Sequence, residues 1–227
     1  MKQIDFDHQV EAAISGHPIL SLLPDRSRRQ FVLEAALFRI EKGEALYQAG
    51  EPTDFGWAIV SGQFKIVKRS RKKKDFVVEI VVPGELCGAP CIGRKPRLVF
   101  DAFAAEESVA LRFPIVLLEA VAATDLRVAQ ALLRDCCRRL YHAEHMRSLL
   151  GEDVAGRVAC ALVYLQAKFG DEIPQTRRTL AQLAGTTVES AIRATRRLSE
   201  EGILETGRHQ IRILKAGELK NVAHPTR

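Results

Sequence analysis

Apolar residues between about Leu20 and Phe113 occur in short runs that glycine and proline interrupt. In the segments GWAIVSGQFKIVKRS, DFVVEIVVPGELCG and LVFDAFAAEESVALRF, apolar and polar positions alternate or form runs of a few residues. Runs of this kind, bounded by turn residues, are typical of β-strands. The pattern therefore predicts an antiparallel roll or barrel in this part of the chain.

The pattern becomes helical from Pro114 to Leu150, a stretch without glycine. Its apolar or small residues recur three and four positions apart, which is the spacing of a coiled-coil seam, until Arg147 interrupts it. Two interpretations remain open: the helix packs on its own domain, or the narrow stripe pairs with the same helix of a second chain. The seam consists of Leu126, Ala129, Leu133, Cys136, Leu140, Ala143 and Leu150.

Three further helical segments and a terminal hairpin follow from Glu152. The segment EDVAGRVACALVYLQAKFG predicts an amphipathic helix that ends at Gly170, because glycine favours the position after a helix C-terminus. The segment TRRTLAQLAGTTVESAIRATRRLSEEGIL, residues 176–204, predicts two short helices with a turn at Gly185. The segment GILETGRHQIRILK then predicts two strands around Gly207, which is the shape of a wing.

The two short helices have the pattern of a helix-turn-helix, whose second helix enters the major groove of DNA. Glu189, Arg193 and Arg197 fall on the outward face of that helix. Arginine can donate two hydrogen bonds to guanine, and glutamate can accept one from cytosine. The positions expected to face the core are Leu180, Leu183, Ala184, Ala191, Ala194, Thr195 and Leu198.

Each outward residue also has a purely structural interpretation. Thr186 and Glu189 have the spacing of a capping box, in which Glu189 only caps its own helix. Arg196 and Arg197 are placed to pair with the two glutamates of Ser199-Glu200-Glu201-Gly202. We favour base contact over these alternatives for Glu189 and Arg193.

Composition limits the function classes. The 227 residues are 47% hydrophobic and 27% charged, with a net charge of +6, so a globular protein with an anionic partner such as DNA fits. The sequence has no stretch suited to a signal peptide or a membrane helix, so we expect a cytoplasmic location and no membrane partner. An odd count of five cysteines argues against a disulfide scaffold. No catalytic motif stands out, so we do not expect an enzyme.

From Leu20 to Leu214 the chain resembles the cAMP receptor protein and fumarate–nitrate regulator (CRP/FNR) family. The order and spacing of several blocks carry this resemblance: ILSLLP, EKGEALYQAGEPTDFGWAIVSGQFKI, PGELCG, the long helix, AGRVACALVYL and the helix-turn-helix. The resemblance implies an α+β fold with a sensory, cyclic-nucleotide-binding-like β-roll (residues 1–113), a central dimerisation helix (114–150) and a winged helix-turn-helix (151–227). It also implies a homodimer that binds palindromic operators in double-stranded DNA and acts with RNA polymerase.

The segment TVESAIR, residues 187–193, resembles the FNR-type recognition helix, because Val188 stands where the cAMP-type helix has arginine. This resemblance implies a half-site of the TTGAT type. It also matches Arg177 to a phosphate-contacting position of the family. The expected DNA-binding residues are Thr176, Arg177, Thr187, Val188, Glu189, Ser190, Arg193 and Arg197.

The effector region resembles the family only in part. Gly84, Glu85 and Leu86 match the Gly-Glu-Leu of cyclic-nucleotide binders, but RKPRLVFDA offers Arg94 and Arg97 without the adjacent Ser or Thr that seats the cyclic phosphate. We therefore expect no cAMP binding. The FNR-type iron–sulfur site uses N-terminal cysteines, and no cysteine precedes Cys87.

Several effectors remain open. Cys87, Cys91, Cys136 and Cys137 either converge on a metal, a cluster or a redox pair, or are small buried residues. His142 and His145, with Tyr141, either serve a haem or lie on a helix surface. The cofactor is thus a haem, an iron–sulfur cluster or none, and the small-molecule effector is unknown. The candidate pocket comprises Gly84, Glu85, Leu86, Cys87, Cys91 and Cys136.

A rival function class is a cyclic-nucleotide-binding module that acts on a protein partner. The basic segment KRSRKKKD, residues 68–75, lies between two predicted strands and predicts a hairpin turn. Its charge either hydrates a loop or docks that partner. Titration with a cyclic nucleotide, compared with operator DNA, separates the two classes.

Overall fold

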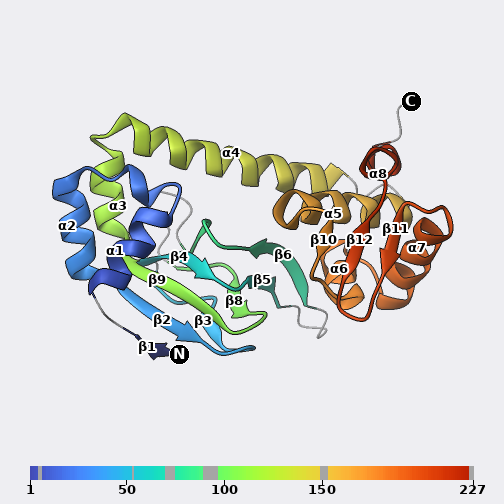
Figure 1. Cartoon of the computed structure of the whole chain (residues 1–227), viewed down its shortest axis with the longest axis horizontal. Helices are drawn as coiled ribbons and strands as arrows, with labels where there is room; N and C mark the ends of the chain where they lie inside the picture. The colour runs from blue at the N-terminus through green and yellow to red at the C-terminus, as the bar shows by residue number, and fades with distance from the viewer. Residues whose placement is uncertain (5–6, 53, 70–74, 89–96, 149–152, 225–227) are drawn as a thin grey trace. The chain divides into compact units, whose positions relative to one another are not determined.

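The computed structural model describes residues 1–4, 7–52, 54–69, 75–88, 97–148 and 153–224 (Figure 1). The chain divides into two compact units. The first comprises Met1–Lys74 and Val78–Arg138, and the second comprises Asp75–Val77 and Arg139–Arg227. The division falls within the long helix α4 (Leu126–Ser148).

Two antiparallel sheets form most of the first unit, as the alternating pattern predicts. One sheet has the strand order β1-β2-β9-β4-β7 and the other has β3-β8-β5-β6. The strands are β1 (Lys2–Gln3), β2 (Ala36–Ile40), β3 (Ala45–Tyr47), β4 (Phe55–Ser61), β5 (Phe64–Lys68), β6 (Phe76–Val81), β7 (Leu86–Cys87), β8 (Asp101–Ala104) and β9 (Ser108–Pro114). The tip of the predicted basic hairpin, residues 70–74, lies outside the described residues.

Side chains from both sheets share one buried cluster. It includes Phe38 of β2, Trp57 and Ile59 of β4, and Phe64 and Ile66 of β5. Because successive side chains of a strand point to opposite faces, the alternation along these strands sends every second side chain into this core. Burial of one face of each strand therefore explains both the sequence pattern and the observed roll.

A second apolar cluster, which the strand pattern did not predict, lies between helices and strands of the first unit. The covering helices are α1 (Asp7–Gly16), the 3₁₀ turn η1 (Leu20–Leu22) and α2 (Asp25–Glu34). Their apolar side chains pack with β4, β9 and the two helices that follow β9. Helix α2, DRSRRQFVLE, buries only Phe31 fully. One buried position gives too weak a periodic signal to predict a helix from the sequence.

The region predicted to be helical from 114 to 150 contains two helices. Helix α3 (Ile115–Ala122) ends before Thr124, and α4 begins at Leu126. The Asp125 carboxylate accepts a hydrogen bond from the backbone N–H of Arg127 at 2.9 Å. Such a short acidic side chain stabilises a helix N-terminus, which explains the new start. The hydrogen bond from the Arg127 side chain is the main cause that lowers the pKa of Asp125 to about 2.

The second unit holds a winged helix-turn-helix. Its helices are α5 (Val154–Phe169), α6 (Arg177–Leu183), α7 (Val188–Glu200) and α8 (Ala216–Ala223). Its sheet has the order β10-β12-β11, with β10 (Glu172–Ile173), β11 (Leu204–Thr206) and β12 (Ile211–Ile213). The predicted wing is the antiparallel pair β11–β12, in which Thr206 lies opposite Ile211. Strand β10 and helix α8 are additions to the prediction.

Helix α5 has the predicted end and a well-defined start. Gly170 adopts φ +73° at its C-terminus, a conformation that favours glycine. The Asp153 carboxylate accepts the backbone N–H of Gly156 at 2.7 Å. Among the helices that the structure describes, none combines the length and the apolar character needed to cross a membrane.

Candidate nucleic-acid interface and effector region

A threonine begins each helix of the helix-turn-helix. The Thr176 hydroxyl accepts the backbone N–H of Thr179 at 3.1 Å, and the Thr187 hydroxyl accepts that of Ser190 at 3.2 Å. Between the helices, Gly185 adopts φ +59°, which few other residues tolerate. These local interactions fix where α7 starts, and therefore which of its side chains face outward.

The inward faces are those that the sequence predicts. Leu180, Leu183 and Ala184 are buried around α6, and Ala191, Ala194, Thr195 and Leu198 are buried along α7. The Thr195 hydroxyl donates to the backbone carbonyl of Ala191 at 2.9 Å, so this polar group is satisfied inside the core. Burial of one face leaves the opposite face of α7 to solvent.

The exposed face of α7 carries Glu189, Ile192, Arg193, Arg196 and Arg197. A guanidinium nitrogen of Arg193 donates to the Ser190 hydroxyl at 3.1 Å, and the Thr187 hydroxyl donates to the same Ser190 oxygen at 3.1 Å. This chain of hydrogen bonds holds the Arg193 head near the start of the helix. The N-terminal turns of a recognition helix are the part that reaches base edges.

The capping box between Thr186 and Glu189 is not the arrangement observed. The residue that caps α7 is Thr187, one position later, and its partner is the N–H of Ser190. Glu189 still interacts with the helix start. A hydrogen bond from its own backbone N–H is the main cause that lowers its pKa, and the Thr187 side chain and the charge of Arg193 contribute. Glu189 is therefore a charged, exposed carboxylate beside Arg193.

The remaining arginines of α7 form the predicted surface ion pairs. Arg196 pairs with Glu200 at 2.9 Å and Arg197 with Glu201 at 3.0 Å, each over one helical turn. Exposed pairs of this kind contribute about 0–1 kcal/mol, so DNA phosphates can compete for either arginine. Arg177 is half-buried at the first position of α6.

In the first unit, the Gly-Glu-Leu turn is present and its glutamate is engaged. Gly84 adopts φ +84° and starts the turn. One carboxylate oxygen of Glu85 lies 3.1 Å from Arg138 of α4, and the other accepts the N–H of Val82 at 3.1 Å. A ligand that bound the Glu85 carboxylate would have to displace these partners.

The other described residues of the predicted effector pocket lie on two elements, β7 and α4. Leu86 and Cys87 are buried in β7, and Cys136 is half-buried on α4. Arg97 donates to the backbone carbonyl of Gly50 at 2.6 Å, so its guanidinium stabilises a neighbouring loop. Cys91 and Arg94 lie outside the described residues.

The histidines considered for a haem pack against protein side chains. The His142 ring stacks on Tyr164 of α5 with centroids 3.8 Å apart, and Tyr141 and His145 stack at 6.3 Å. In the described part of the chain, one group of three potential metal ligands is present: His145, Cys160 and His224. The sequence pattern does not reveal this group, because the residues are 15 and 64 positions apart and form no spaced motif.

Comparison with known proteins gives matches in both units. Residues 37–125 match the cyclic nucleotide-binding domain family, and residues 156–222 match the Crp-like helix-turn-helix domain family. The CRP-like cAMP-activated global transcriptional regulator of Mycobacterium tuberculosis is 26% identical over 170 residues, which cover 71% of this chain and 76% of that protein. Electron transport regulator A of Shewanella oneidensis is 25% identical over 193 residues, covering 81% and 77%. The structure of FixK2 from Bradyrhizobium japonicum aligns with a TM-score of 0.76 at 25% identity, over 85% of this chain and 99% of that one.

Proposed function

Because this chain belongs to the CRP/FNR family of transcription regulators, we propose that it is a homodimer that binds a palindromic operator under the control of an effector. In this proposal residues 1–113 sense the effector, residues 114–150 join two chains, and residues 151–227 bind DNA. RNA polymerase is the expected protein partner at the promoter.

The observation that carries the proposal is the exposed pair Glu189 and Arg193 on α7. Both side chains lie on the face opposite the buried Ala191 and Leu198, within the first two turns. The fork of an arginine fits the O6 and N7 acceptors of guanine, and a carboxylate accepts from the N4 amino group of cytosine. We assign Arg193 to the guanine and Glu189 to the cytosine of the G·C pair in a TTGAT-like half-site.

The other expected DNA contacts position the helix and carry no sequence information. Arg177 and Thr176, at the start of α6, are placed to hold a phosphate, as is Arg197 once it leaves Glu201. Thr187, Val188 and Ser190 complete the surface at the start of α7. A palindrome requires two such surfaces, one from each chain.

The exposed stripe on α4 supports the dimer. Leu126, Leu133 and Leu140 follow one another at seven-residue intervals and are 71%, 63% and 59% exposed. Ala129, Cys136 and Ala143 each follow one of these leucines by three positions on the same seam, as in the knobs and holes of a coiled coil. A row of exposed leucines on a charged helix is explained by a second copy that covers it.

We propose that the effector is not cAMP. The Glu85 carboxylate already binds Arg138 and the N–H of Val82, and Arg97 binds the carbonyl of Gly50. A redox, haem or metal signal is the alternative input, and the pocket of Gly84, Glu85, Leu86, Cys87, Cys91 and Cys136 is its proposed region. The effector would change the relative population of DNA-binding conformations.

Fluorescence anisotropy tests the proposed function directly. The probes are a duplex with two inverted TTGAT half-sites, the same duplex with one half-site scrambled, and one with both scrambled. We expect tightest binding to the intact palindrome, and no effect of added cAMP. Equal affinity for all three duplexes would contradict the DNA-binding proposal, and micromolar cAMP binding in calorimetry would contradict the effector proposal alone.

A further inference from the structure

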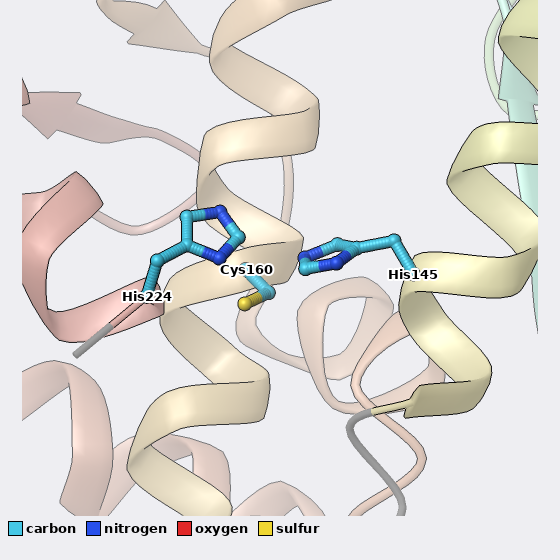
Figure 2. A group of neighbouring side chains, drawn as sticks. All are labelled: His145, Cys160 and His224. Atoms are coloured by element: carbon cyan, nitrogen blue, oxygen red, sulfur yellow. The ribbon is translucent and has the colours of Figure 1, made fainter. Parts of the chain in front are cut away.

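Three side chains from distant parts of the sequence meet in the second unit, as Figure 2 shows. His145 lies in the last turns of α4, Cys160 in the middle of α5, and His224 directly after α8. One ligand atom from each residue lies within 4.8 Å of the other two. Both imidazole rings and the thiol point toward a common space.

The surrounding contacts hold these side chains in place. The Cys160 sulfur lies 3.1 Å from the carbonyl oxygen of Ala223, the residue before His224, so α8 is fixed against the thiol. His142 stacks on Tyr164 at 3.8 Å, one turn of α4 before His145 and one turn of α5 after Cys160. One stacking contact therefore joins α4 to α5 next to the cluster, and one hydrogen bond joins α5 to the end of α8.

The separations suit a small tetrahedral ion. Zinc binds cysteine sulfur at about 2.3 Å and histidine nitrogen at about 2.0–2.1 Å, so its ligand atoms lie roughly 3.4–3.6 Å from one another. The observed limit of 4.8 Å exceeds this by about 1 Å, which side-chain rotation can supply. The centroids of the His145 and His224 rings are 4.7 Å apart with an interplanar angle of 47°, so the rings do not stack face to face.

The ligand chemistry favours zinc over hard cations. A thiolate and two imidazoles are soft or borderline ligands, whereas magnesium and calcium prefer oxygen. Cys160 is buried, and His224 is exposed. An ion can therefore enter from the His224 side, and water can occupy a fourth position.

We propose that His145, Cys160 and His224 bind one zinc ion per chain. The ion cross-links the end of α4 to α5 and α8 and stabilises the C-terminal unit. Binding releases the thiol proton of Cys160, because the thiolate is the ligand, and replaces the hydrogen bond to the Ala223 carbonyl. This site does not depend on the proposed DNA-binding function, and its test uses no DNA.

The experiment measures metal binding to the full chain. Protein stripped with a chelator is titrated with zinc in competition with a chromophoric chelator, and separately with cobalt, whose absorption reports a thiolate ligand and tetrahedral geometry. We expect one equivalent per chain, a cobalt–thiolate band, and a higher melting temperature with zinc. Cys160→Ser should abolish the band, and Cys160→Ser and His224→Gln should each weaken zinc binding by at least about tenfold.

Two matched controls lie outside the cluster. His209→Gln removes an exposed histidine of the second unit, and Cys137→Ser removes an exposed cysteine of α4. Both should keep the cobalt band and one equivalent of zinc. If circular dichroism shows that Cys160→Ser does not fold, the zinc affinity of His224→Gln decides whether the site exists. The exposed His224 ring can be replaced without disturbing the core.

Two results would overturn the proposal. One is the absence of stoichiometric zinc binding and of the cobalt–thiolate band in the unmodified chain. The other is wild-type binding in His224→Gln, which would exclude His224 as a ligand and with it the proposed three-residue site. In the first case Cys160 is a buried thiol that hydrogen-bonds a helix carbonyl and has no metal.

Discussion

Helices α4 and α7 each bury one face and expose the other, but the exposed faces differ in chemistry. On α4, Val128 and Leu132 are buried while Leu126, Leu133 and Leu140 remain exposed. On α7 the exposed side chains are two glutamates, three arginines and Ile192. An apolar stripe gains free energy only when another apolar surface covers it, whereas arginines gain by contact with phosphates and base edges. The two exposed faces therefore support the two proposed partners, a second chain and DNA.

The largest expected effect comes from charging the α4 stripe. In the double variant Leu133→Glu and Leu140→Glu, four leucines, two from each chain, leave the proposed dimer interface. Each buried leucine contributes about 1.5–3 kcal/mol, so the dissociation constant of the dimer should rise more than about a thousandfold. Sedimentation velocity should then show a monomer at micromolar concentration.

The matched control for this variant is Leu33→Glu on α2. Leu33 is 85% exposed, more than Leu126, Leu133 or Leu140, and does not belong to the stripe. This variant should remain a dimer. A stripe variant that still sediments as a dimer would exclude α4 as the interface and would leave its leucines unexplained.

The second effect concerns the charged face of α7. Arg193→Ala should lose about 1–3 kcal/mol per half-site, because the proposed bidentate contact to guanine disappears. Arg196→Ala is the control, since Arg196 lies on the same exposed helix and pairs with Glu200. Anisotropy titrations of both variants on the intact palindrome make the comparison. Equal losses would mean that the face binds DNA by charge alone.

A smaller effect is expected from Arg177, which we assign to a phosphate. Arg177→Ala should weaken binding to all sequences alike. The slope of log K against log salt should become shallower by roughly 0.9 for each phosphate that the variant no longer neutralises. A change in base preference, with the slope unchanged, would instead assign Arg177 to base recognition.

The smallest effect on DNA affinity is expected from Glu189. Its variants distinguish a contact with cytosine from stabilisation of the helix start. If Glu189 accepts from cytosine, Glu189→Ala relaxes the preference at that base pair. If it only stabilises the helix start, where Thr187 is already the cap, the variant should lose about 0.3–1 kcal/mol of stability and keep its operator. Glu189→Gln is informative here, because it keeps the size of the side chain and removes its charge. Melting temperature and base preference, measured on both variants, separate the two roles.

The sequence predicted the features that repeat along the chain. Short apolar runs such as Phe55–Ser61 indicate strands, and the three-and-four spacing from Ala191 to Leu198 indicates the second helix of the helix-turn-helix. These patterns predict the elements correctly because burial of one face of a helix or strand repeats apolar residues with the period of that element. Helix α2 and helix α8 were missed, since each is short and contributes few buried residues.

Features that depend on contacts between particular side chains, most of them far apart in the sequence, could not be predicted from the sequence. The break before α4 requires Asp125 to bind backbone N–H groups, which competes with continuation of the helix. The pair of Glu85 and Arg138 joins residues 53 positions apart. The cluster of His145, Cys160 and His224 joins three elements, one of them α8, which the sequence did not reveal. The assignments of individual residues to DNA, effector and dimer contacts stay predictions.

Selection of binding sites from random duplex DNA tests the central claim most directly. The unmodified chain and Arg193→Ala are selected in parallel and their bound pools sequenced. We predict that the unmodified chain enriches two inverted TTGAT-like half-sites, and that Arg193→Ala keeps the inverted arrangement but loses the preference at the G·C pair. Enrichment of a single unrepeated site, or an unchanged guanine preference in Arg193→Ala, would contradict the account of paired chains that read DNA through α7.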